Sequence, residues 1–313
     1  MKTMLNKTHV EGLLYEHKLE KKVSGPNSKT PGTEFIAGSV SIATDDAGVN
    51  IVPVHFTYVT AKTAKGKDNS AYTTLARIID GSLSSIMQGG KETAAKLRID
   101  SAINLNEFYT DRNGKEELVS AKRNEGGFIH VVDELDPDEN KRNTFECDMV
   151  ITGVTRVDAN EEKQTPEKVI VRGAIFTFRG ELLPVDFSAT NPHAMNYFEG
   201  LGVTNQEPVF TKLWGRQESE VVVKTIVEES AFGDDSIKEV KSTRKDFLIT
   251  GSIREPYVWD DETTILASEL GEAMAARQTA LATMKKRQED YKASRASAPV
   301  PSVATPAAGS FVF

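Results

Sequence analysis

The chain has 313 residues, a net charge of −8 and a single cysteine. This length suits about two domains, and an apolar content of 39% is typical of a soluble globular protein. The sequence contains no run of about 18 apolar residues, so we expect no membrane span. With no apolar signal core at its start and no second cysteine to pair with Cys147, the chain is expected to act in a reducing cytoplasm.

The first third of the chain predicts a strand, a hairpin and a helix. Residues 10–23 alternate as a strand, and residues 24–32 have the composition of a loop. A hairpin is expected over residues 35–56, followed by a lysine-rich loop. Ser70 is the expected cap of a helix that extends to Gln88, because apolar residues recur there at spacings of three and four.

The middle of the chain predicts further strands. Residues 97–109, 118–132 and 144–157 alternate, with a break at Gly126-Gly127 in the second of them. Cys147 falls on the apolar face of the third, so we expect a core residue and not a reactive thiol.

Residues 169–187 predict a second hairpin, which turns at Arg179-Gly180-Glu181. Pro53 and Pro184 occupy corresponding places in the two hairpins. A proline inside a strand belongs at an edge or a bulge, so the repetition favours one architecture used twice. The alternative is a chance similarity of two hairpins.

The C-terminal region changes character at Asp260. A seam at alternating spacings of four and three predicts an amphipathic helix over residues 260–292, which would pack in a coiled coil or against the body of the same chain. The seam consists of Leu270, Met274, Arg277, Leu281, Met284, Gln288 and Tyr291. Residues 293–313 are rich in Ala, Pro and Ser and are expected to form a disordered tail that ends in Phe311-Val312-Phe313.

Catalytic signatures are missing from the sequence. Gly89-Gly90-Lys91 lacks the spacing of a phosphate-binding loop, and the five histidines show no paired metal-ligand spacing. We therefore expect no enzyme activity, no cofactor and no metal.

The order of three strands, a helix and two strands is that of the oligonucleotide-binding (OB) barrel. We predict a mainly β protein with some α structure, built from tandem OB-like β-barrel units at residues 1–143 and 144–259. The C-terminal helix over 260–292 and the disordered tail over 293–313 follow them.

OB barrels bind single strands through strands 2 and 3, with aromatic platforms and a basic groove. In the first unit these strands carry Phe35, His55 and Tyr58. Trp214 shares a face with two cations while Leu213 faces the core. The alternative role for Phe176 and Phe178 is packing between the two units. For Trp214 the alternative is burial against the neighbouring unit or the C-terminal helix. The predicted nucleic-acid-binding residues are Lys62, Lys65, Lys67, Arg172, Phe176, Phe178, Arg179, Lys212, Trp214 and Arg216.

The block from Phe145 to Gly202 resembles bacteriophage-encoded single-stranded-DNA-binding proteins of the OB class. It contains Asp-Met-Val-Ile-Thr-Gly-Val, Leu-Leu-Pro-Val-Asp-Phe and Asn-Tyr-Phe-Glu-Gly-Leu. The resemblance is one of layout, so it assigns no individual residue. It implies sequence-independent, non-catalytic binding of single-stranded DNA in phage DNA replication or recombination, in the cytoplasm of the host bacterium.

The resemblance also implies partners. These are single-stranded DNA and either a second copy of the chain or a replication protein, reached through the C-terminal helix and tail. No membrane is involved. Bacterial relatives of this class end in an acidic tip with a terminal Phe, whereas Phe313 has no acidic neighbours. The alternative function, which the acidic net charge favours, is a phage virion or assembly protein that acts through protein–protein contacts.

Overall fold

The computed structural model describes residues 4–112, 115–160, 165–204, 206–228, 236–260 and 265–296. Within these ranges, the side chains of residues 220–228, 236–244 and 294–296 are not described. The part of the predicted tail that follows Ala296 lies outside the described residues.

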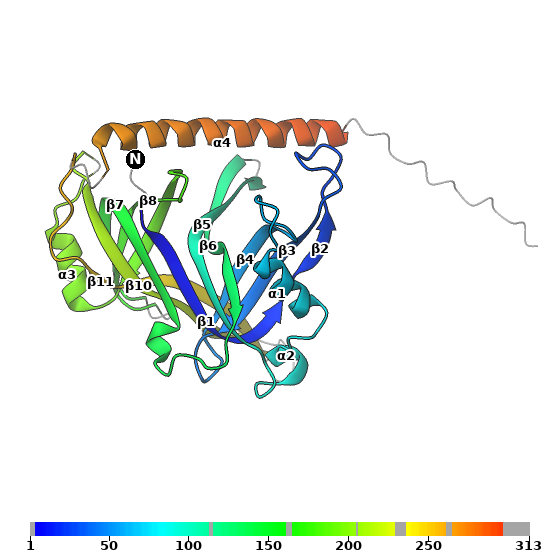
Figure 1. Cartoon of the computed structure of the whole chain (residues 1–313). Helices are drawn as coiled ribbons and strands as arrows, with labels where there is room; N and C mark the ends of the chain where they lie inside the picture. Colours follow the sequence, from blue (N-terminus) through cyan, green and yellow to red (C-terminus); the bar gives the residue numbers. More distant parts are fainter. Residues whose placement is uncertain are drawn as a thin grey trace, which may run out of the picture.

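Eleven strands of the described chain form one sheet that closes on itself twice (Figure 1). In the first closure, β1 (Asn6–His17) pairs with β3 (Glu34–Ala43), and β3 pairs with β4 (Ile51–Thr60). The barrel continues from β4 to β6 (Lys115–Val131), from β6 to β5 (Lys96–Arg112), and from β5 back to β1. Only the β4–β6 pairing is parallel. The short β2 (Glu20–Val23) extends the sheet beyond β3.

The second closure repeats this connectivity. Here β7 (Asn143–Val157) pairs with β8 (Lys168–Phe176), and β8 pairs with β9 (Leu182–Ala189). The barrel then continues in parallel to β11 (Ser236–Ser252), to β10 (Val209–Glu228), and back to β7.

A helix separates the third and fourth strands in each barrel: α1 (Ser70–Ile79) in the first and α3 (Pro192–Gly200) in the second. Five strands in the order 1-2-3-5-4-1, with a helix between strands 3 and 4, form an OB barrel. The predicted mainly β fold with tandem OB-like barrels is confirmed.

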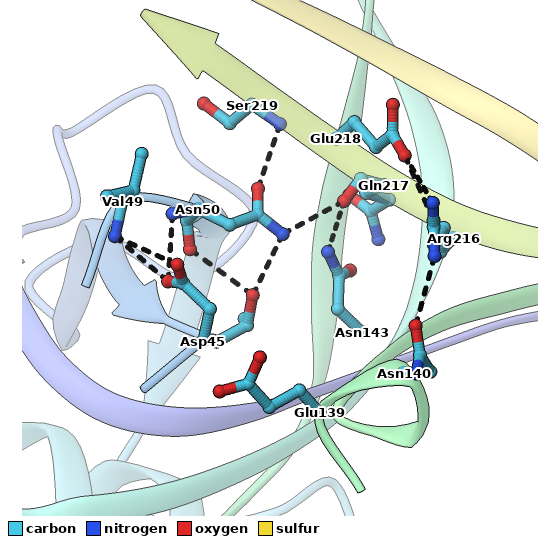
Figure 2. Close-up of a pocket in the computed structure, with 11 residues that line it drawn as sticks. Asp45, Val49, Asn50, Glu139, Asn140, Asn143, Arg216, Gln217, Glu218 and Ser219 are labelled. Carbon is cyan, nitrogen blue, oxygen red and sulfur yellow. Dashed lines mark hydrogen bonds and ion pairs between the residues drawn. The ribbon is translucent and has the colours of Figure 1, made fainter. Parts of the chain in front are cut away.

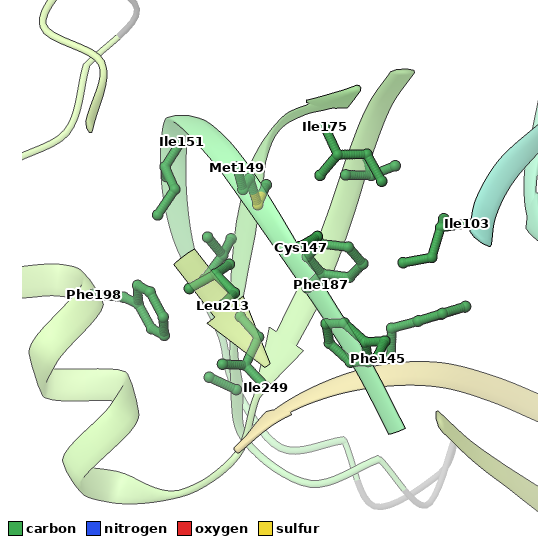
Figure 3. Close-up of a cluster of buried hydrophobic side chains, with 14 of the residues drawn as sticks. Ile103, Phe145, Cys147, Met149, Ile151, Ile175, Phe187, Phe198, Leu213 and Ile249 are labelled. Atoms are coloured by element: carbon green, nitrogen blue, oxygen red, sulfur yellow. The ribbon is translucent and has the colours of Figure 1, made fainter. Parts of the chain in front are cut away.

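Each barrel has its own hydrophobic core. In the second barrel, Phe145 and Phe187 pack together (Figure 3). Phe247 packs against both, and the three ring centroids are 5.0 to 5.9 Å apart. Cys147 lies in the same cluster and is fully buried, which raises the pKa of its thiol. It is a core residue, as predicted, because a neutral buried thiol is a poor nucleophile.

The helix predicted over residues 70–88 begins at Ser70 as expected, but its cap and its end were predicted wrongly. Asn69, not Ser70, caps α1, because its side chain accepts a hydrogen bond from the Ala71 amide. The helix ends at Ile79, where Gly81 adopts a positive φ of 81° and starts a turn. A separate short helix, α2 (Ile86–Gly89), follows that turn.

The two barrels are joined through β1. Residues Thr8–Leu13 pair with β5 along one edge of this strand. Along its other edge, Asn6–Val10 pair with β7 of the second barrel, and Leu13–His17 pair with β3 of the first. Continuous hydrogen bonding therefore fixes the barrels relative to each other.

The last helix, α4 (Ala267–Ala296), crosses both barrels on one side of the molecule (Figure 1). Its 30 residues span about 45 Å. On the second barrel, Ala273 of α4 is buried against Phe176 and Phe210. Toward the first barrel, Arg277 forms an ion pair with Glu107 of β5 at 2.5 Å. The helix thus packs on the body of its own chain.

Several sequence predictions for this helix need correction. It begins at Ala267 and not at residue 260, and residues 293–296 are helical although we predicted them to belong to the tail. Met274 and Tyr291 of the predicted seam are 52% and 62% exposed. A straight α-helix has about 3.6 residues per turn, whereas a heptad pattern repeats about every 3.5, so residues of the seam gradually rotate away from the surface on which the helix packs. Within the described residues, no helix has the length and apolarity that a membrane span requires.

Candidate nucleic-acid interface

OB barrels present their ligand-binding face on strands 2 and 3. In this chain these are β3 and β4 of the first barrel and β8 and β9 of the second. The two faces differ in what covers them.

The helix α4 covers part of the second barrel's face. Ala174 and Phe176 point outward from β8 but are buried in a cluster with Ile265 and Ala273. Phe176 has no exposed surface. Its predicted role as a base-stacking residue is therefore wrong, because its ring is already packed against the C-terminal helix.

The rest of the second barrel's face is largely neutralised. Lys168 of β8 bonds to Asp246 at 2.7 Å and to Ser188 at 3.1 Å. Arg172 is exposed and lies opposite Asp186 in the sheet. Phe178 is 78% exposed at the β8–β9 turn, with the Arg179 guanidinium 5.2 Å from the centroid of its ring.

The candidates on β10 lie on another surface, because β7 separates β10 from β8. Leu213 is fully buried and Trp214 is 39% exposed, which confirms the predicted alternation of their faces. The ring of Trp214 lies against the backbone of Gly251. Lys212 forms an ion pair with Glu146, so one of the cations beside the indole is neutralised.

The other neighbouring cation, Arg216, lies in a polar pocket between the barrels (Figure 2). It donates to Glu218 at 3.0 Å and to Asn140 at 3.0 Å. In the same pocket, Asn50 accepts from the Ser219 amide at 2.8 Å and donates to the Gln217 carbonyl at 3.2 Å. These bonds connect the β3–β4 turn with β10, so the pocket joins the two barrels structurally.

The predicted lysines of the first barrel lie in the loop between β4 and α1. Lys62 is paired with Asp68 at 2.6 Å, and both side chains are exposed. Lys65 and Lys67 are exposed as well. The predicted residues therefore occupy separate places: this loop, the β8–β9 turn, the middle of β8 and the outer face of β10.

The outer face of the first barrel carries an open aromatic pair. The ring centroids of Phe35 on β3 and Tyr58 on β4 are 4.4 Å apart, and Tyr58 is 47% exposed. A β-bulge on β4 places Thr57 and Tyr58 opposite Ala37, so both exposed side chains leave the barrel. Two hydrogen bonds orient Tyr58: its hydroxyl lies 2.8 Å from the Thr30 hydroxyl and 3.1 Å from the Ser24 hydroxyl. These bonds lower the pKa of Tyr58.

A polar row crosses the same face beside the aromatic pair. Ser39 of β3 lies opposite His55 of β4, and the Lys18 amide donates to the Ser39 carbonyl at 2.8 Å. His55 in turn lies opposite Glu125 of β6. Burial, and then the positive charge of Arg123, lowers the pKa of His55, which favours the neutral ring.

The sequence predicted that Phe35, His55 and Tyr58 lie on strands 2 and 3. It did not predict Lys18 or Lys245 as site residues. Lys18 follows the end of β1, and Lys245 comes from β11 of the other barrel. No local pattern identifies either residue, because only the closed barrels bring them near His55. Among the described residues, no group of three or more His, Cys, Asp or Glu side chains could hold a metal ion.

Comparisons with known proteins place the chain in a family. A family model described as YorF matches residues 5–287. The chain belongs to the YorF family. A search of the curated proteins finds no match for this YorF protein.

Four chains of solved structures match the YorF chain. One is a crystal structure of a deletion mutant of the single-stranded DNA binding protein from Thermus aquaticus. The match has 8% sequence identity and a TM-score of 0.44, and it covers 84% of the YorF chain and 100% of the other. The strand order of the two barrels, and not this likeness, identifies the YorF fold as OB.

Proposed function

We propose that this YorF protein binds single-stranded DNA without sequence preference, on the outer face of β3 and β4. The observation that supports the proposal is the Phe35–Tyr58 pair on β3 and β4 of the first barrel, in which Phe35 is half-buried and Tyr58 is exposed. Every base has a π-face, so base–aromatic stacking tolerates any sequence.

The local chemistry favours a single strand over a duplex. Bases stack on side-chain rings only after they have left the base stack of a duplex. The hydrogen bonds from Ser24 and Thr30 hold the Tyr58 ring in place before any ligand arrives. A ring that is already ordered loses little conformational entropy when a base stacks on it.

The asymmetry of the barrels favours the first one for the base contacts. Phe176 of the second barrel is buried under α4, and the cation Lys168 is satisfied by Asp246. A role in DNA replication or recombination, and an origin in a bacteriophage, remain predictions that follow from the sequence resemblance.

Fluorescence anisotropy with a labelled, unstructured oligonucleotide tests this function. Tyr58→Ala is expected to weaken binding by about 1–3 kcal/mol, which is about 5- to 150-fold. Phe128→Ala is the matched control, because Phe128 is 70% exposed but lies in another surface pocket with Lys7 and His9. Equal affinities of the wild type and Tyr58→Ala, or a wild-type protein that does not bind, would contradict the proposal.

A further inference from the structure

A groove runs between the two barrels beside the aromatic face. Its first wall comes from β4 and β6, with His55 and Lys122, and its second from β10 and β11, with Ser219 and Lys245. His55 belongs both to this groove and to the polar row on the outer face. The groove is therefore continuous with the proposed base-binding face.

Most charges around the groove are neutralised by protein partners. Lys122 is paired with Asp186 at 2.6 Å, and Arg123 is paired with Glu125 at 2.8 Å. On the opposite wall, Asp246 is occupied by Lys168 at 2.7 Å. The carboxylates that could neutralise a further cation here are already engaged.

Lys245 lines the groove and has no ion pair to any described residue. The same holds for Lys18 of the first barrel, whose amide bonds to Ser39, the cross-strand neighbour of the groove residue His55. Both side chains are exposed at the surface. Partial desolvation of the Lys245 ammonium beside the groove wall, and then the charge of Lys18, lowers the pKa of Lys245. The fold thus brings two like charges together and leaves them uncompensated, an arrangement that an anion would stabilise.

Among the described side chains that line the groove, no Phe, Tyr or Trp ring is open to a base. Phe187 and Phe247 lie behind its wall, 1% and 7% exposed, with the Lys122 ammonium 5.4 and 5.5 Å from their centroids. The uncompensated charge beside the groove is positive, which fits a phosphate better than a base.

We infer that the groove between the barrels binds the phosphate backbone of the bound strand, with Lys18 and Lys245 as a phosphate clamp built from both barrels. This inference rests on the proposed binding of single-stranded DNA by the Phe35–Tyr58 face. The strand stacks its bases on β3 and β4 of the first barrel, passes His55, and continues into the groove. Because β1 is bonded to β7, the two halves of the clamp stay at a fixed separation.

The salt dependence of oligonucleotide binding measures this clamp directly. Each phosphate contact on a single strand contributes about 0.7 to the negative log–log slope of affinity against salt concentration. We expect Lys18→Ala and Lys245→Ala each to make the slope shallower by about 0.7 and the double variant to make it shallower by about 1.4. Lys18→Arg and Lys245→Arg should retain the wild-type slope, because the charge is kept.

Two controls separate this inference from the proposed function. Lys286→Ala removes an exposed lysine of α4 and should leave the slope unchanged. Tyr58→Ala should lower affinity at every salt concentration with the wild-type slope, because it removes stacking and no charge. If Tyr58→Ala weakens binding while Lys18→Ala and Lys245→Ala keep the wild-type slope, the clamp is wrong and the proposed function stands. If the wild type does not bind the oligonucleotide, both fail.

Discussion

Gln288 of α4 and Tyr109 of β5 exchange two hydrogen bonds across 179 positions of sequence. The Gln288 side chain donates to the Tyr109 carbonyl at 2.6 Å and accepts from the Tyr109 amide at 3.2 Å. The pairing of β5 with β1 ends at Ser101, so no part of β1 pairs with this edge of β5 at Tyr109. The Gln288 carboxamide supplies the donor and the acceptor that a neighbouring strand would otherwise provide. Asn6 bonds in the same way to the amide and carbonyl of Ile103, at 2.9 Å each. The exposed edge of β5 is therefore covered by side chains.

Replacing Gln288 with Leu should destabilise the protein, because it leaves the amide and carbonyl of Tyr109 without partners. The expected loss is about 1–3 kcal/mol in the free energy of unfolding. Urea denaturation measures it, and hydrogen exchange should show faster exchange of the Tyr109 amide. Gln278→Leu is the control, since Gln278 is an exposed glutamine of the same helix. Equal losses for the two variants would show that the pair of bonds contributes nothing.

Gly251 should be intolerant of alanine because of Trp214. A Cβ at Gly251 would lie 2.3 Å from the indole nitrogen of Trp214, so the ring would have to leave its place. We expect Gly251→Ala to cost about 1–3 kcal/mol of stability and to shift the tryptophan emission toward that of an exposed indole.

A double-mutant cycle checks the cause. In a Trp214→Leu background the same Gly251→Ala change should cost much less, because no ring is displaced. Strictly additive losses would mean that the indole is not seated on Gly251.

His55 should make stability depend on pH near neutrality. Burial, and then the positive charge of Arg123, lowers its pKa below the ordinary 6.5, so the folded chain takes up this proton less readily than the unfolded chain. Near and below pH 6.5 the unfolded state therefore binds more protons than the folded state. The contribution of neutral His55 to the free energy of unfolding is complete above pH 6.5 and declines as the pH falls through that value.

Unfolding free energies of the wild type and of His55→Gln, measured between about pH 7.5 and pH 5.5, test this effect. The wild type should lose more stability on acidification than the variant does. His193→Gln serves as the control, because His193 is exposed on α3. The same loss for the wild type and His55→Gln would rule out the role given to His55.

The sequence predicted the fold well because the OB barrel has a distinctive order of elements. Period-two alternation also identified the inward face of β8, where Val169, Val171 and Ile175 are fully buried. It failed for Phe176, because alternation states which face a side chain is on and not what covers that face. The cap of α1 was misplaced by one residue, since Asn69 and Ser70 are both favourable cap residues and only geometry distinguishes them.

The site was harder to predict than the fold. Phe35, His55 and Tyr58 could be found because they lie on two strands of one hairpin. Lys18 and Lys245 could not, because each stands in a polar stretch where a lysine is unremarkable. Conversely, Arg277 and Gln288 looked like interruptions of an apolar seam. They are the residues that hold α4 to the first barrel, because a sheet edge offers polar backbone groups as well as apolar surface.

One edge of β1 is shared between β7 of the second barrel and β3 of the first, which has a consequence for the order in which the protein can fold. On the ribosome, β1 is made before β7, so Asn6–Val10 find their partners only after Asn143–Cys147 have been synthesised. A nascent chain that ends after β6 would carry an unpaired strand edge, which is a template for association with other chains. The contacts of Arg277 and Gln288 are added last, from the opposite end of the sequence. The first barrel is thus translated before the second, but its strand β1 is fully paired only after β7 has been made.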